Sequence, residues 1–204
     1  MDTITHRKRL VRSAALAARQ AIAPELKAEK SSRVCRQLTA FLDMHAESGK
    51  DIRTVSVYSA LAKELNLAEF IRCVYDRGLR VVFPCMNRTE VRSERMDMRL
   101  VDREDFERGN VPFVCSPVEA FERDEAALSA FPIVPPEEVD LVVVPLVAYD
   151  PQNRRLGYGA GNYDTFLADL RPDALVAGAA FVEQMVDEVP CESHDVPLPY
   201  IATA

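Results

Sequence analysis

The sequence predicts an α/β fold of three layers, α/β/α, around a mostly parallel sheet. Short apolar runs rich in β-branched residues, such as 141–144, are typical of strands buried on both faces. These runs alternate with longer amphipathic segments typical of helices, and a strand–helix–strand order indicates parallel pairing. Because 204 residues suffice for one good core, we expect residues 1–204 to form a single domain.

The composition is that of an ordinary globular protein, with 48% hydrophobic and 28% charged residues. Five dispersed cysteines form no Cys-x-x-Cys pair, which favours reduced thiols over a disulfide framework or structural zinc. No apolar run approaches the roughly 20 residues of a membrane helix. We therefore expect a cytoplasmic protein without a membrane partner.

The net charge of −7 is unevenly distributed. Residues 1–40 carry nine Lys/Arg against three acids, whereas the rest of the chain is strongly acidic. An acidic body argues against nucleic-acid binding. The basic N-terminal segment is expected to be a solvated helix face, and a mitochondrial presequence is the less favoured alternative.

Two helices are expected at the N-terminus, over 5–21 and from Pro24 to about His45. Proline is tolerated in the first turn of a helix, so Ala23-Pro24-Glu25 marks a new start. Further helices are expected at 65–77, ending before Gly78, and at 162–170. Strands are expected at 54–58, 81–83, 95–101, 141–144 and 175–181. We expect a surface excursion at 113–138 and an irregular tail at 189–201.

Residues 140–164 carry the strongest chemical signal. A buried strand is followed by a turn, by Arg154 and Arg155, and then by glycines 157, 159 and 161 before a helix start. Glycines let backbone N–H groups approach an oxyanion, and arginines suit phosphate or carboxylate. Asp164 is a hard oxygen ligand suited to Mg²⁺. The loop alone leaves a second interpretation open, a flexible hairpin with two solvated arginines.

A resemblance to a known family begins at these residues. Residues 155–164 (RLGYGAGNYD) resemble the RLGxGxGYYD signature of the 5-formyltetrahydrofolate cyclo-ligase family, also called methenyltetrahydrofolate synthetase. Residues 144–150 resemble its VPxxxFD strand, and residues 181–184, 189–190 and 194–197 resemble its FxxQ, VP and HDxP tail. The resemblance covers nearly the whole chain.

The resemblance implies the fold shared by ribose-5-phosphate isomerase-like and CoA-transferase-like proteins. It also implies an enzyme, a ligase of one-carbon folate metabolism that binds ATP and 5-formyltetrahydrofolate and depends on Mg²⁺. The reaction would form 5,10-methenyltetrahydrofolate and release ADP and phosphate. We expect a monomer. The alternatives are a non-catalytic folate- or nucleotide-binding regulator and, more remotely, a sugar-phosphate isomerase without ATP.

The family's N-terminal K-x-x-x-R helix falls on Lys8 and Arg12 by register from the turn at 23–25. Their spacing places both on one helical face, although a solvated face would be favoured without the resemblance. Lys8 and Arg155 are the predicted catalytic residues. The complete predicted ATP site is Lys8, Arg12, Arg155, Leu156, Gly157, Tyr158, Gly159, Ala160, Gly161, Asn162 and Tyr163.

The segment that leaves the strand at 54–58 lies where parallel sheets bind ligands, at the carboxyl end of a strand. By resemblance it lines the folate pocket, with Tyr58, Ser59, Glu64 and Tyr158 as substrate-binding residues. Without the resemblance, Glu64 would equally well cap the next helix. The resemblance places the Mg²⁺ carboxylates at Asp164 and Asp195.

Several positions depart from the family pattern. Ala160 stands where the family has glycine or lysine, and Asn162 replaces an aromatic residue. Phe113-Val114 replaces Glu-Pro in a predicted pocket wall, which puts folate geometry in doubt more than ATP binding. Met96 and Met98 are expected to be core residues, and His194 is expected to be structural.

Overall fold

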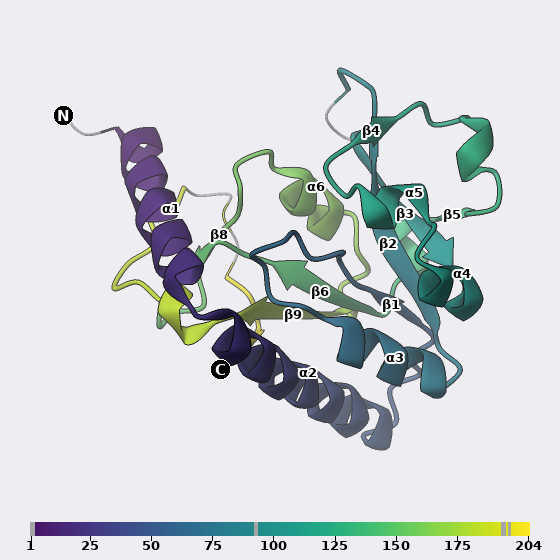
Figure 1. Ribbon diagram of the computed structural model, residues 1–204, viewed down its shortest axis with the longest axis horizontal. Coiled ribbons are helices and arrows are strands. Elements are labelled where there is room, and N and C mark those ends of the chain that lie inside the picture. Colours follow the sequence, from purple (N-terminus) through teal and green to yellow (C-terminus); the bar gives the residue numbers. More distant parts are fainter. Residues whose placement is uncertain (1–2, 92–93, 193–194, 196) are drawn as a thin grey trace.

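The computed structural model describes residues 3–91, 94–192, 195 and 197–204, and it has the predicted mixed α/β architecture with a mostly parallel central sheet (Figure 1). The strand order is β10-β9-β6-β1-β2-β3-β5, with β4 paired to β2. Pairing is parallel from β10 to β2 and antiparallel from β2 to β5. The strands of this sheet are β1 (Thr54–Ser56), β2 (Arg80–Asn87), β3 (Met96–Val101), β4 (Ala120–Phe121), β5 (Ile133–Val134), β6 (Leu141–Pro145), β9 (Leu175–Ala180) and β10 (Tyr200–Thr203).

A separate two-stranded hairpin joins β7 (Ala148–Tyr149) to β8 (Arg155–Leu156) in antiparallel pairing. The α-helices are α1 (Ile4–Ala21), α2 (Pro24–Glu47), α3 (Ala68–Asp76), α4 (Arg103–Arg108), α5 (Pro112–Cys115) and α6 (Asn162–Ala168). Short 3-10 turns are η2 (Ala126–Leu128), η3 (Pro136–Glu138) and η4 (Val182–Gln184).

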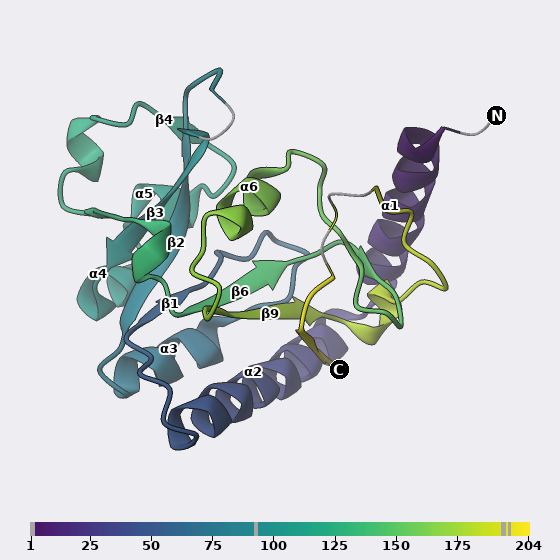
Figure 2. The same ribbon diagram turned by 180° about the vertical axis from the view of Figure 1, so that it is seen from behind.

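The sheet is covered on both faces, as the apolar run of β6 predicts. Leu141 and Val143 point into the core beneath α2 and α3, whereas Val142 and Val144 point into the core beneath α6. Figure 1 and Figure 2 show α2 and α3 on one face of the sheet and α6 on the other. The three-layer arrangement therefore follows from alternation along a fully buried strand.

Helix α1 differs from α2 because it covers neither face of the sheet. Its partners are η4, the hairpin and the chain near Val189. Ala15 packs in a cluster with Val147, Ala148 and Leu156. Both views show it beside the hairpin end of the molecule. This position brings the basic face of α1 to the glycine-rich loop that follows β8.

Of two expectations about irregular segments, one was wrong and the other missed only the final strand. Residues 113–138 are not a mere surface excursion, because β4 and β5 extend the sheet and Phe113 and Phe131 pack edge-to-face in the core. The described part of the C-terminal tail is irregular up to residue 199, as expected, and only its end enters β10, which pairs with β9. Both segments have too few apolar residues in a row to show a strand period.

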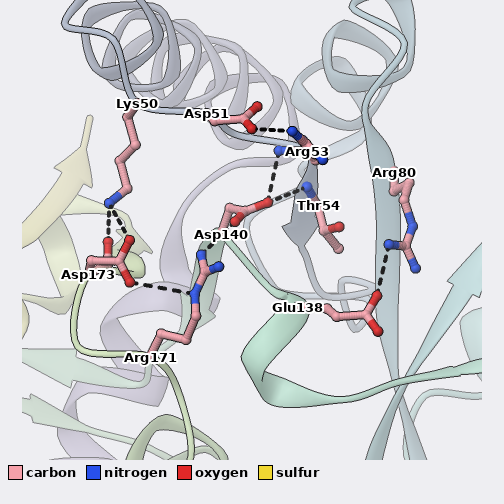
Figure 3. Close-up of polar contacts among 9 residues, drawn as sticks. All are labelled: Lys50, Asp51, Arg53, Thr54, Arg80, Glu138, Asp140, Arg171 and Asp173. Carbon is pink, nitrogen blue, oxygen red and sulfur yellow. Dashed lines mark hydrogen bonds and ion pairs between the residues drawn. The ribbon is translucent and has the colours of Figure 1, made fainter.

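The amino-terminal ends of β1 and β6 are joined by the carboxylate of Asp140 (Figure 3). Asp140 is 6% exposed, and its Oδ2 accepts hydrogen bonds of 2.8 Å from the backbone N–H groups of Arg53 and Thr54. Its Oδ1 accepts a hydrogen bond of 2.6 Å from Arg171. One buried carboxylate thus fixes the relative position of two central strands, at the edge opposite the one where their carboxyl ends lie.

We predict that Asp140→Ala lowers the free energy of unfolding by about 3 kcal/mol, because three donors lose a buried acceptor. Urea denaturation measures this loss. Glu138→Ala is the matched control, since Glu138 forms an exposed ion pair with Arg80 at 3.0 Å and should change stability by about 0.5 kcal/mol or less. Equal effects of the two variants would contradict the anchoring role of Asp140.

Candidate functional site

A cavity of about 360 Å³ lies at the carboxyl ends of the central strands. Pro145, the last residue of β6, lines it, and so do Pro84 and Met86 in the second half of β2. This is the edge where parallel sheets bind ligands. The cavity brings together every site residue predicted from the sequence: Lys8, Arg12, Tyr58, Ser59, Glu64, Arg155, Leu156, Gly157, Tyr158, Gly159, Ala160, Gly161, Asn162, Tyr163, Asp164 and Asp195.

Lys8 and Arg12 reach this cavity from one face of α1. The Nζ of Lys8 donates hydrogen bonds to Asp195 at 2.7 Å and to Glu192 at 2.9 Å. Burial alone would lower the pKa of Lys8, but these two carboxylates outweigh burial and the pKa is raised. The Nε of Arg12 donates to the carbonyl oxygen of Gly157 at 2.7 Å. The solvated-face interpretation is therefore wrong for both side chains.

The hairpin β7–β8 supports the glycine-rich loop. Its turn is held by the fully buried Asp150, whose carboxylate accepts hydrogen bonds from the backbone of Gln152, Arg154 and Val189 at 2.9–3.1 Å. Burial raises the pKa of Asp150, but these donors and the Arg154 side chain outweigh it and the pKa is lowered. The turn predicted at 150–153 is thus an internally bonded support, and its Arg154 is used there rather than in the cavity.

Two of the three loop glycines have backbone angles that favour glycine. Gly159 has φ +105° and Gly161 has φ +75°. A Cβ at Gly159 would lie 3.2 Å from the Nη2 of Arg12, so the loop and α1 meet closely here. Gly157 has no positive φ, and a Cβ there would meet nothing within 4 Å. Of these two positions, only 159 would bring an added Cβ against the Arg12 side chain.

Arg155 and Asp164 form an ion pair across the loop. The side chain of Arg155 is 8% exposed, whereas that of Asp164 is 54% exposed. Together with the contacts of Lys8, this pair shows that the predicted phosphate-binding cations face the predicted metal-binding carboxylates. In these pairs the carboxylates offset the cost of burying Lys8 and Arg155.

The described residues contain no group of three or more His, Cys, Asp or Glu side chains arranged to hold a metal ion. Asp164 and Asp195 nevertheless supply carboxylate oxygens to one cavity. Mg²⁺ is usually bound by one or two carboxylates together with substrate phosphates. The donor set fits that mode of binding and does not fit a closed metal site made by protein alone.

The end of the cavity formed after β1 is lined by tyrosines and Glu64. The hydroxyl of Tyr158 donates to the Oε1 of Glu64 at 2.5 Å, and burial together with this bond raises the pKa of Tyr158 to about 12. The Oε2 of Glu64 accepts from the backbone N–H of Leu61 at 2.9 Å. Glu64 does not cap α3, so the alternative interpretation of this residue is wrong.

The remaining predicted residues at this end are held by local contacts. Tyr58 is buried and donates to the carbonyl oxygen of Leu65 at 3.2 Å, while Ser59 donates to that of Val114 at 2.6 Å. The hydroxyl of Tyr163 and the Oδ1 of Asn162 are buried without a hydrogen-bond partner among the described residues. Burial also raises the pKa of Tyr163. These two groups can therefore form hydrogen bonds with a bound ligand.

Several lining residues were missed by sequence reasoning. Glu192 is one, because a single acid in a tail carries no pattern. The predicted wall at Phe113 is wrong: this side chain is 1% exposed in the core, and Pro117 and Val118 line the cavity instead. Met98 is a core residue, as predicted, whereas Met96 is only partly buried against that core and lines the cavity, so the prediction was wrong for its position. The other missed residues are apolar, namely Leu61, Pro84, Met86 and Pro145. His194 lies outside the described residues.

The model of the 5-formyltetrahydrofolate cyclo-ligase family matches residues 4–204. The chain belongs to this family. The predicted resemblance and the predicted enzyme class, a ligase, are thereby confirmed. None of the described helices combines the length and the apolar character that crossing a bilayer requires.

Two relatives of this cyclo-ligase family chain match most of its length. It is 24% identical to the 5-formyltetrahydrofolate cyclo-ligase of Escherichia coli K12 over 91% of this chain and 93% of that protein. It is 26% identical to the mouse cyclo-ligase over 84% of this chain and 82% of that protein. The solved 5,10-methenyltetrahydrofolate synthetase of Mycoplasma pneumoniae superposes with a TM-score of 0.70 at 22% identity, covering 96% of this chain and 97% of that structure. This similarity confirms the predicted fold class.

For this cyclo-ligase family member we predict that Gly159→Ala destabilises the protein by about 1 kcal/mol or more, because φ +105° strains an L-residue and the methyl group displaces Arg12. Thermal unfolding checks the change. Gly157→Ala is the control within the same loop and should be close to neutral, since its φ is ordinary and its surroundings are open. If Gly157→Ala were the more damaging change, the description of this loop would be wrong.

Proposed function

We propose that the protein catalyses the ATP- and Mg²⁺-dependent cyclisation of 5-formyltetrahydrofolate to 5,10-methenyltetrahydrofolate, with release of ADP and phosphate. The observation that carries the proposal is one cavity with two chemically different ends. One end has Lys8, Arg12 and Arg155 around a glycine-rich loop, and the other has Glu64 among tyrosines. Family membership supports the same reaction.

The cationic end suits a polyphosphate. Phosphate oxygens would take Lys8 and Arg155 from their present carboxylate partners, Asp195 and Asp164. The freed carboxylates would hold Mg²⁺, which supplies neutralisation of phosphate charge when bound. Each group thus exchanges one opposite charge for another, so binding of the complex leaves no buried charge unpaired. This exchange supports joint binding of metal and nucleotide.

The other end suits the substrate. Glu64 would accept N–H donors of the pterin ring, and Tyr58, Ser59 and Tyr158 would form the surrounding walls. Met86 and Met96 add polarisable side chains that pack well against aromatic rings. The unpartnered hydroxyl of Tyr163 would donate to an oxygen of the ligand between the two ends.

The proposed chemistry needs no protein nucleophile. The formyl oxygen attacks the γ-phosphorus of ATP, and the bond from that phosphorus to the β,γ-bridging oxygen breaks to release ADP. The second folate nitrogen then attacks the activated formyl carbon and loses its proton. The bond from that carbon to the phosphorylated oxygen breaks, and phosphate leaves with the proton. Lys8 and Arg155 neutralise charge on the transferring group, which is the main task in phosphoryl transfer.

We also propose the compartment, oligomeric state, domain organisation and partners that the sequence predicts. The protein is a cytoplasmic monomer with one domain over residues 1–204, and it has no nucleic-acid or membrane partner. Five free cysteines support a reducing compartment.

The test is a spectrophotometric assay with purified protein, Mg-ATP and 5-formyltetrahydrofolate. We expect ATP-dependent growth of the near-ultraviolet band of the methenyl product, together with ADP release. Binding of both ligands by calorimetry without ADP release would overturn the proposal in favour of a non-catalytic regulator. In that case Ala160 and Asn162, the departures within the loop signature, are the positions to revert first.

We predict that Lys8→Ala raises the KM for ATP by about tenfold or more, since a charge-assisted hydrogen bond to phosphate is lost. Steady-state kinetics with varied ATP measure the change. Arg7→Ala is the control, because the neighbouring Arg7 is 51% exposed and pairs with Glu188 at 3.7 Å, away from the cavity. An ATP KM that responds to Arg7 and not to Lys8 would shift the register of the predicted motif.

We also predict that Asp164→Asn abolishes Mg²⁺-dependent turnover while the protein stays folded, because the amide is a weaker ligand for a hard cation. Activity is titrated against Mg²⁺, and circular dichroism verifies the fold. Asp169→Asn is the control, since Asp169 ends the same helix and does not line this cavity. Retention of most activity in Asp164→Asn would remove Asp164 from the metal site.

A further inference from the structure

Arg19 is a buried cation that the reaction described above does not use. Ala15 and Arg19 are the buried residues among those described in α1, and Arg19 is 5% exposed. Burying a guanidinium costs several kcal/mol unless it is well paired. An arginine held this way at the edge of a ligand cavity therefore needs an explanation.

The contacts of Arg19 lead directly to the substrate end of the cavity. Its Nη2 donates to the hydroxyl of Tyr158 at 2.7 Å, and its Nη1 lies 3.7 Å from the Oε1 of Glu64. Its guanidinium carbon also lies 5.8 Å from the centroid of the Tyr158 ring. The hydroxyl of Tyr158 therefore accepts from Arg19 while it donates to Glu64, and α1, the loop after β1 and the glycine-rich loop meet at one point.

The hydrogen bonds of Glu64, which lines the cavity, leave part of its acceptor capacity unused. An ionised carboxylate offers about four lone-pair sites. Tyr158 uses one on Oε1 and the N–H of Leu61 uses one on Oε2, so one site remains on each oxygen. Two parallel acceptors match a ring that presents two neighbouring N–H donors. Arg19 supplies the positive charge that offsets burial of this carboxylate.

We propose that Arg19 is a positioning residue for the pterin end of the substrate: it holds the Glu64 carboxylate and Tyr158 in a fixed arrangement and thereby sets folate affinity. This inference rests on the proposed function and assigns a specific task to a residue outside the cavity lining. Arg19 does not line the cavity, so its expected role is to position side chains that do. Its effect passes through Glu64 and the Tyr158 hydroxyl bonded to Glu64, and it leaves the contacts of Lys8 and Arg12 at the ATP end unchanged.

The test measures binding of 5-formyltetrahydrofolate alone, and of ATP alone, by calorimetry. Arg19→Met should weaken folate binding by about tenfold or more, because Glu64 loses its charged partner. ATP binding should stay within about twofold. Arg19→Lys should recover part of the folate affinity, since it restores the charge without the planar fork. If Arg19→Met does not fold, Arg19→Gln replaces it with the same expected result.

A double-mutant cycle separates positioning from independent packing. Glu64→Gln should weaken folate binding, and Arg19→Met added to it should cause little further loss, because the acceptor through which Arg19 acts is already changed. Additive losses would overturn the proposal. Unchanged folate affinity in folded Arg19→Met, or a parallel loss of ATP affinity, would also overturn it.

The matched control is Arg171→Met. Arg171 likewise pairs with a buried carboxylate, that of Asp140 at 2.6 Å, but at the opposite edge of the sheet (Figure 3). It should lower stability and leave folate affinity unchanged. If the wild-type protein forms product and Arg19→Met binds folate as tightly as the wild type, this inference alone is wrong. If the wild-type protein binds folate but forms no product, the proposed reaction alone is wrong.

Discussion

Parallel pairing of β6 with β1 on one side and β9 on the other fixes the position of every other part of this molecule. Because these strands run in the same direction, their carboxyl ends meet at one edge. Their opposite ends are joined through Asp140 and Arg171. Strand β6 then continues through Pro145 into the hairpin that supports the glycine-rich loop. A single edge thus receives the loop, the segment after β1 and the face of α1.

The cavity at this edge is organised by charge compensation. Lys8 is paired with Asp195 and Glu192, Arg155 with Asp164, and Arg19 with Glu64 through Tyr158. Each pair lowers the cost of burying a charge in a site that must offer charge to a ligand. The pairs also fix side chains that would otherwise be mobile, so a ligand meets a prearranged surface.

The fold and most of the site could be predicted because their signals are local. An apolar run marks β6, and an ordered string of ten residues marks the loop. Glu192 and Arg19 were not predicted, since their roles depend on contacts across more than 100 residues of sequence. A signal for Arg19 does exist: it follows Lys8, Arg12 and Ala15 at a helical period, so all four share the face of α1 that meets the body. Phe113 was misplaced because a resemblance between motifs does not indicate whether a side chain points into a cavity or into the core.

The contact between Lys8 and Glu192 has a consequence for biosynthesis. These residues are 184 positions apart in the sequence. Strand β6 at the centre of the sheet also needs β9, which is made later, as its second neighbour. A chain emerging from the ribosome can form α1, α2 and the β1–β2 pair early. Its cavity is incomplete until the segment that carries Glu192 has been synthesised. Contacts of such large sequence separation slow folding and leave strand edges exposed meanwhile. Unfinished chains of this protein are therefore expected to be inactive and to depend on protection of the unpaired edge of β6 during synthesis.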